Sequence, residues 1–271
     1  MKKYYLSFLL VLIVALAAVG FLSFNAIKNY LSELRSTISN IDTPEIVSQP
    51  VLSGKYEYKS KNGINIQIGS FDINLFKSNL DSLSTAQEVS LKNNDQVVVN
   101  GGYFTETKAY IGLLWNGTEK LGSLSVGNQQ ATHVAHFNKT TKELNFISSL
   151  EFEDSDYIPD ANNIYFQAGP LIVNNNEIQT PLIDRSLNGN QSAVRTFVGF
   201  TESGKIFTGV TTQVYDLRSL ASQLVSKDFF DGEKISVLNL DGGSSTSLYS
   251  NENPAISFRY FKQLPYFVEF K

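Results

Sequence analysis

An alternation of apolar and polar residues from residue 56 onward constrains the fold of this chain more than any other feature. Ile64, Ile66 and Ile68 alternate with Asn65 and Gln67, which predicts a strand with one buried face. Further apolar segments of strand length are predicted strands at 71–75, 97–99, 133–137, 144–147, 164–166, 171–173, 194–200, 206–210, 235–240 and 266–270.

Few segments show helical spacing. Asp216 is placed to cap a helix whose apolar face is formed by Leu217, Leu220, Ala221, Leu224 and Val225. A weaker helical pattern covers residues 80–91, and Asn174-Asn175 predicts a hairpin turn. Many strands and few helices predict an α+β domain with a mixed, mainly antiparallel sheet.

The residues before 56 follow a different pattern. Lys2 and Lys3 precede an apolar run at residues 4–24, and about 21 helical residues span about 30 Å, the thickness of a bilayer core. We predict an N-terminal transmembrane helix (1–24) with a cytoplasmic N-terminus, a helical stalk and linker (25–55) and an external domain (56–271). The alternative is a signal peptide cut near Ala15-Leu16-Ala17, which would leave a secreted protein.

Composition excludes several chemistries. The chain of 271 residues has a net charge of −4, and a mildly acidic chain is a poor general binder of nucleic acid. It has no cysteine, so disulfides, thiolate nucleophiles and zinc–cysteine sites are excluded. His133 and His136 are three apart in a predicted strand and point to opposite faces, so we interpret them as ordinary strand residues. No cofactor or metal is predicted.

Three loops, each directly after a predicted strand, combine polar groups with glycines. Each alone is explained by a tight turn, whereas three of the same kind predict a shared cleft at the strand ends. They are Asn100-Gly101-Gly102-Tyr103-Phe104, Gln167-Ala168-Gly169-Pro170 and Asn239-Leu240-Asp241-Gly242-Gly243-Ser244-Ser245-Thr246.

The third loop is the richest in reactive groups. It offers the carboxylate of Asp241, consecutive backbone amides at Gly242 and Gly243, and the hydroxyls of Ser244 and Ser245. It matches neither a P-loop nor the G-x-S-x-G elbow. A basic residue, Arg195, interrupts the predicted strand 194–200, and a charge there needs either a structural ion pair or a ligand.

Taken in order, these segments resemble the phosphodiester glycosidase family. The resemblance covers roughly residues 60–271, with two departures: Val194 stands where the family usually has proline, and Ser244 where it commonly has a third glycine. The matching pieces are the loops at 100–104, 167–173 and 238–245, Arg195-Thr196 with Gly199, and the helix at 217–224.

The resemblance implies an extracytoplasmic hydrolase that cleaves a sugar-1-phosphodiester at the anomeric carbon, and so a carbohydrate phosphodiester as substrate. Asp241 would stabilise the oxocarbenium-like transition state, as nucleophile or electrostatic partner. Arg195 would hold the phosphate bidentately, helped by the amides of residues 242–244. Asn100, Gln167 and Asn239 would orient sugar hydroxyls or water, and the glycines 101, 102 and 169 would let the ligand approach.

Some questions stay open at this point. The second catalytic carboxylate is not evident, and Glu106 and Asp184 are the candidates. An external location would favour cell-envelope or exopolysaccharide glycans. A non-catalytic surface module that binds an anionic envelope glycan is the alternative function, and a divalent-metal hydrolase organised on Asp241 is a third hypothesis.

Overall fold

The computed structural model describes residues 56–155 and 159–271. Within these ranges no helix is both long and apolar enough to cross a bilayer. The predicted membrane helix (1–24) and the stalk and linker (25–55) lie outside the described residues. Both therefore stay predictions.

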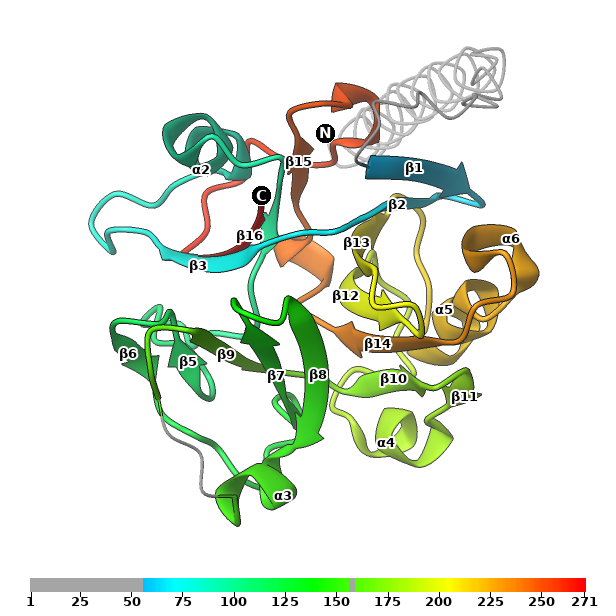
Figure 1. Ribbon diagram of the computed structural model, residues 1–271, viewed down its shortest axis with the longest axis horizontal. Helices are drawn as coiled ribbons and strands as arrows, with labels where there is room; N and C mark the ends of the chain where they lie inside the picture. Colours follow the sequence, from blue (N-terminus) through cyan, green and yellow to red (C-terminus); the bar gives the residue numbers. More distant parts are fainter. Residues whose placement is uncertain (1–55, 156–158) are drawn as a thin grey trace, which may run out of the picture. The chain divides into compact units, whose positions relative to one another are not determined.

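The largest sheet has seven strands and contains the alternating segment that begins at Ile64 (Figure 1). Neighbouring strands within it pair antiparallel. Its order is β1 (Tyr56–Lys61), β2 (Ile64–Gly69), β13 (Ile206–Thr211), β12 (Thr196–Thr201), β14 (Ile235–Asn239), β10 (Leu171–Asn174) and β11 (Glu177–Ile178).

Two smaller antiparallel sheets complete the strand framework. The four-stranded sheet has the order β15 (Leu248–Ser250), β4 (Val97–Asn100), β16 (Tyr266–Phe270) and β3 (Ile73–Lys77). The five-stranded sheet has the order β6 (Lys120–Gly122), β5 (Leu114–Trp115), β9 (Asn163–Ala168), β7 (His133–Asn138) and β8 (Glu143–Ser148). The prediction of an α+β, mainly antiparallel fold is confirmed, and the strand pairs within the described residues include no parallel one.

Helices are few, as predicted, and those of the described residues are short. Asp216 caps α5 by accepting a hydrogen bond from the Ser219 backbone N–H at 2.8 Å. The predicted helix at 80–91 begins later, at Ala86. The helices of the described residues are α2 (Ala86–Asn93), α3 (Ser149–Glu153), α4 (Thr180–Arg185), α5 (Leu217–Leu224), α6 (Lys227–Phe230) and the 3₁₀ turns η1 (Gly243–Ser245) and η2 (Pro254–Ile256).

Two apolar cores hold the sheets and helices together. The larger core lies where the three sheets meet and includes Val99, Phe137 and Leu238. The second core includes Phe197 of the seven-stranded sheet and Leu220 of α5. The chain that leaves β14 lies at the centre of the view in Figure 1, among strands of all three sheets. The segment that follows β14 therefore lies close to strands that are distant from it in the sequence.

Both histidines lie in β7 and contact neighbouring polar or aromatic groups. His133 Nδ1 is 2.9 Å from Thr132 Oγ1, and burial lowers the pKa of His133 to about 4. His136 Nε2 is 2.7 Å from Asn163 Oδ1, and the ring stacks on Tyr165 with centroids 4.7 Å apart. Their contacts are those of strand residues within a sheet.

Candidate functional site

The first loop, the arginine segment and the third loop are joined by backbone hydrogen bonds. Leu240 N–H donates to the Thr196 carbonyl at 2.8 Å, and Asp241 N–H donates to the Gly101 carbonyl at 3.3 Å. Gly243 N–H donates to the carbonyl of Val194 at 2.7 Å. Residue 194 contributes only its backbone carbonyl to this bond, so the bond does not depend on whether the residue is valine or proline. Asp241 is thus fixed between two segments that are distant in the sequence.

Asp241 is a partly buried carboxylate at the exit of β14. Burial raises its pKa to about 6, although hydrogen bonds from the Ser245 side chain and the Gly242 backbone N–H, and the charge of Lys262, act in the opposite direction. The carboxylate is therefore mainly ionised at neutral pH. Its pKa is well placed for a group that stabilises positive charge or exchanges protons near neutrality.

Asn100 connects the three segments through a side chain whose polar groups are all engaged within the protein. Its Nδ2 donates to the carbonyls of Gly101 at 3.1 Å and Asp241 at 2.7 Å. Its Oδ1 accepts from Thr196 Oγ1 at 2.7 Å and from Ser247 N–H at 3.0 Å. This buried amide therefore fixes the backbone of Asp241 and has no free group for a sugar, contrary to the role expected for it.

Arg195 is buried, with 2% of its surface exposed, and burial lowers its pKa. Its Nε donates to the Tyr215 carbonyl at 3.0 Å, and its Nη2 donates to the carbonyls of Asn188, at 3.0 Å, and Gln191. No carboxylate of the described residues forms an ion pair with it. Most of the guanidinium donors that were expected to bind a phosphate are therefore occupied, and only Nη1 is available to a ligand.

Gln167 is also turned into the protein. Its Nε2 donates to the carbonyls of Ser125 and Ala131, each at 2.6 Å. Its Oε1 accepts from the N–H groups of Leu113 at 2.8 Å and Ser125 at 3.0 Å. The side chain thus ties the loop between β6 and β7 to Leu113, which precedes β5, and all of its hydrogen-bonding capacity is used. It does not reach a ligand in this arrangement.

Asn239 differs from the other two amides because one of its atoms is left open. Its Nδ2 lies within hydrogen-bond distance of Tyr103 Oη (3.0 Å) and of the carbonyls of Gly169 (3.0 Å) and Leu240 (2.8 Å). Its Oδ1 is buried and has no partner among the described residues. An orphaned buried acceptor is uncommon in a native protein. A buried water molecule could use the unpaired Oδ1, and the predicted role of this residue stays a prediction.

The glycines of the loops serve close packing more than ligand approach. A Cβ on Gly102 would lie 2.5 Å from Tyr110 Oη, and one on Gly101 would lie 3.1 Å from Tyr266 Cβ. Gly243 has φ of +58° and open space around it, and its amide is bound to Val194. Ser244 is exposed, whereas Ser245 is buried and bonds to Asp241. The expected anion nest at residues 242–244 therefore has few free amides.

Among the described residues, no second carboxylate acts on Asp241. Glu106 is exposed in the turn after the first loop. Asp184 accepts a hydrogen bond from Arg218 Nη2 at 2.7 Å on the surface of α4. Within the residues that the structure describes, no group of three His, Cys, Asp or Glu side chains is arranged to hold a metal ion. Within the described part of the chain, Asp241 is therefore the one carboxylate found at the site.

The structure adds three cations that the sequence analysis missed. Lys262 and Asp241 act on each other electrostatically, and Arg259 and Lys108 act on Lys262. Arg259 Nη1 also donates to the Gly243 carbonyl at 3.2 Å. Lys108 lies far in the sequence from Arg259 and Lys262, which share one loop, and the three residues form no motif. Only the tertiary structure could bring them to the site.

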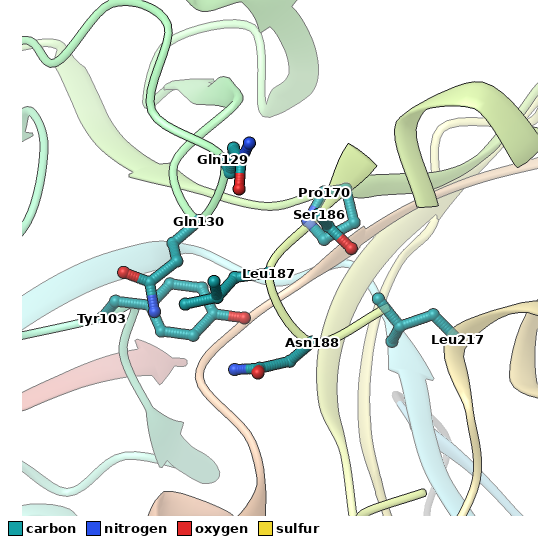
Figure 2. Close-up of a pocket in the computed structure, with 8 residues that line it drawn as sticks. All are labelled: Tyr103, Gln129, Gln130, Pro170, Ser186, Leu187, Asn188 and Leu217. Atoms are coloured by element: carbon teal, nitrogen blue, oxygen red, sulfur yellow. The ribbon is translucent and has the colours of Figure 1, made fainter. Parts of the chain in front are cut away.

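Tyr103, in the first loop, also belongs to the site, although the sequence indicated roles only for Asn100, Gly101 and Gly102 of that loop. Burial raises its pKa, and the charge of Asp241 raises it further, so the phenol is protonated at neutral pH. A hollow beside Tyr103 adjoins the site on the side of Arg195, since Asn188 both lines it and binds that arginine. Figure 2 shows its lining residues, Tyr103, Gln129, Gln130, Pro170, Ser186, Leu187, Asn188 and Leu217.

Solved structures of similar fold are distant in sequence. The catalytic domain of zebrafish N-acetylglucosamine-1-phosphodiester alpha-N-acetylglucosaminidase, auto-inhibited by its pro-peptide, matches with a TM-score of 0.55 and 14% identity, over 79% of this chain and 80% of that one. A hypothetical protein from Synechocystis matches with a TM-score of 0.51 and 11% identity, over 79% of this chain and 61% of that one. At such identities the likeness shows the fold alone.

The family comparison covers the site itself. No curated protein matches the sequence. The family model described as phosphodiester glycosidase matches residues 93–264, which include Asn100, Gln167, Arg195, Asn239 and Asp241. More than half of the chain lies within this match, and it contains every loop that forms the site. The chain therefore belongs to the phosphodiester glycosidase family.

Proposed function

We propose that this protein is an extracytoplasmic hydrolase that cleaves a sugar-1-phosphodiester at the anomeric carbon of the sugar. Membership of the phosphodiester glycosidase family supports the reaction class. The observation that carries the proposal is the partly buried carboxylate of Asp241, with a pKa of about 6 and with cations close to it. Such a site suits a reaction in which a sugar gains positive charge while a phosphate leaves.

The reaction consumes one water molecule. A bond forms between the water oxygen and the anomeric carbon, and the bond from that carbon to the phosphate oxygen breaks. The departing phosphate monoester keeps the bonding electron pair, and the proton of the water passes to a base or to solvent. Asp241 would stabilise the oxocarbenium-like transition state, either as a nucleophile or through electrostatics. A phosphate monoester is a good leaving group, so the reaction needs less help from a general acid than hydrolysis of an ordinary glycoside does.

Asn100 and Arg195 would keep the segments around the reacting carboxylate in place. Asn100 holds the Asp241 backbone through its carbonyl at 2.7 Å, and Arg195 holds the carbonyls of the 188–191 loop. Asn239 has the free acceptor, which is buried, so it is the amide best suited to hold a water molecule within the site. In this proposal Asn100 and Arg195 are positioning residues, and Asp241 is the catalytic residue.

The apolar run at residues 4–24 supports an anchor in the cell membrane, with the domain outside. An enzyme in that place would meet phosphodiester-linked glycans of the cell envelope or exopolysaccharides. The same run supports the alternative of secretion after signal cleavage. Fractionation of cells that express the full chain, followed by external protease treatment, tests the location and the size of the mature protein.

The decisive experiment measures release of free sugar from a panel of sugar-1-phosphodiesters by the purified full chain. We expect Asp241→Asn to abolish release, whereas Glu106→Gln and Asp184→Asn, which remove exposed carboxylates, leave it unchanged. Turnover retained by Asp241→Asn would remove this residue from the mechanism. Binding of the glycans without turnover by the wild-type protein would instead support the binding-module alternative.

The pH profile gives an independent test. If the ionised form of Asp241 stabilises the transition state, the rate should rise with pH and reach half of its plateau near pH 6, where the carboxyl titrates. A rate that falls as pH rises through this range would mean that the protonated form is the active one.

A further inference from the structure

Three basic side chains gather beside Asp241 from two separate loops. Lys108 lies between β4 and β5, and Arg259 and Lys262 lie between η2 and β16. The Lys262 backbone N–H donates to the Arg259 carbonyl at 3.0 Å, and Arg259 Nη1 donates to the Gly243 carbonyl at 3.2 Å. We refer to these three residues as the basic cluster.

The backbone of Lys108 is fixed next to the first loop. Tyr266 Oη donates to the Lys108 carbonyl at 2.9 Å, and the Tyr266 carbonyl accepts from Gly101 N–H at 2.9 Å. Lys108 Nζ lies 5.2 Å from the centroid of the Phe104 ring, close enough for a cation–π contact. The ammonium group is therefore held at the edge of the loop that also contacts Asp241.

The basic cluster has an excess of positive charge that the protein does not neutralise. None of its members forms an ion pair with a carboxylate among the described residues. Burial lowers the pKa of Lys262, and the charges of Arg259 and Lys108 lower it further, against the opposite effect of Asp241. Three cations beside one carboxylate leave two positive charges in excess. This excess is notable in a chain whose net charge is −4.

Arg195 contrasts with the basic cluster. Three of its contacts are to backbone carbonyls, which occupy its Nε and Nη2 atoms. Lys108 and Lys262 have no side-chain hydrogen bond within the described part of the chain, so their ammonium groups are free to bind a ligand. A site for an anion needs donors that are not already engaged, and the basic cluster provides them.

We propose that Lys108, Arg259 and Lys262 bind the phosphate of the leaving group, beside the sugar that Asp241 contacts. This inference rests on the proposed function. A phosphodiester carries one negative charge, and the phosphate monoester that leaves carries up to two. The basic cluster therefore binds the transition state and the departing phosphate more tightly than the intact substrate, and accelerates the reaction.

The test compares two substrates that share one sugar. One is its 1-phosphodiester, and the other is its 4-nitrophenyl glycoside, whose leaving group has no phosphate. We compare two full-length variants, Lys262→Gln and the double variant that carries Lys108→Gln and Lys262→Gln. The matched control is Lys234→Gln. Lys234 precedes β14 and Asp241 follows it, so they are about 20 Å apart at about 3.3 Å per residue. Arg259 is left intact because its side chain also binds the Gly243 carbonyl.

We expect Lys262→Gln to lower kcat/KM for the phosphodiester by about tenfold or more and the double variant to lower it further, as loss of charge-assisted bonds requires. The glycoside should lose less than about threefold, and Lys234→Gln should leave both substrates unchanged. An equal loss on both substrates would mean that Lys262 acts by lowering the pKa of Asp241, which would overturn the inference. A loss no greater than that of Lys234→Gln would also overturn it.

Binding of inorganic phosphate separates this inference from the proposed function. Calorimetry should show that the wild-type protein binds phosphate and that the Lys108→Gln, Lys262→Gln double variant binds it at least about tenfold more weakly. If the wild type hydrolyses neither substrate but shows this difference, the proposed function fails and the phosphate site stands. If it hydrolyses the phosphodiester and the double variant binds phosphate as tightly as wild type does, the phosphate site fails and the proposed function stands.

Discussion

Replacement of Asp241 by asparagine should stabilise the protein at alkaline pH while it abolishes activity. The physical reason is that burial raises the pKa of this carboxyl from 3.8 to about 6. Because the folded state disfavours the ionised form, that form costs stability. The cost is absent below the unfolded pKa, near pH 4, and is complete above the folded pKa, near pH 6. The side-chain amide removes the charge at every pH and keeps nearly the same shape.

The size of the effect follows from the pKa difference. About two pKa units at 1.36 kcal/mol per unit correspond to about 2–3 kcal/mol in the free energy of unfolding. For a domain of this size, 1 kcal/mol shifts Tm by about 2–4 °C. The variant should therefore melt about 4–12 °C above wild type at pH 8, on the scale of about 2–4 °C per kcal/mol. Near pH 4 the gain should vanish.

The assay is thermal denaturation followed by circular dichroism, with wild type, Asp241→Asn and Glu106→Gln measured in parallel from pH 4 to pH 8. Only the difference between each variant and wild type is used, so the titration of all other groups cancels. Glu106→Gln removes an exposed carboxylate and sets the baseline. A Tm difference for Asp241→Asn that is the same at pH 4 and pH 8, or that is negative at pH 8, would refute the reasoning.

Three further predictions address the surroundings of the site. Burial, together with the carboxylate of Asp95, raises the pKa of Glu269. Glu269→Gln should therefore raise Tm above that of wild type by more at pH 8 than at pH 4, and it should leave sugar release unchanged. A Cβ on Gly169 would lie 2.5 Å from Thr132 Oγ1 and 2.9 Å from the Thr132 backbone nitrogen. Gly169→Ala should therefore lower the free energy of unfolding, measured by urea titration, by about 1–3 kcal/mol. An unchanged midpoint would contradict this. Exhaustive chelation should leave the rate of hydrolysis unchanged, since the site holds one carboxylate, whereas loss of activity that is restored by a divalent cation would support a metal hydrolase.

The local pattern predicted most of the strands. Segments such as 97–99 and 266–270 are found as β4 and β16 with their bounds shifted by at most one residue. The two- and three-residue strands β5, β6, β11 and β15 were missed because so few residues do not establish a period. The predicted turn at Asn174-Asn175 lies one residue later, where Asn175 and Asn176 both have positive φ.

The roles of polar residues in the site depended on context that no local pattern holds. Asn100, Gln167 and Asn239 look alike in the sequence, since each is a side-chain amide that ends or follows a predicted strand. In the structure two of them have every polar group engaged, and one keeps a free acceptor. The difference arises from which distant loop packs against each amide.

The sequence by itself determined the longer strands, the cap of α5 and the three loops that form the site, because these depend on side-chain periodicity and turn residues within a few positions. The tertiary structure alone decided that Arg195 is bound to carbonyls and that Lys108, Arg259 and Lys262 gather beside Asp241. Electrostatic interactions depend on distance in space, and positions 108, 241 and 262 become neighbours only when the sheets pack together.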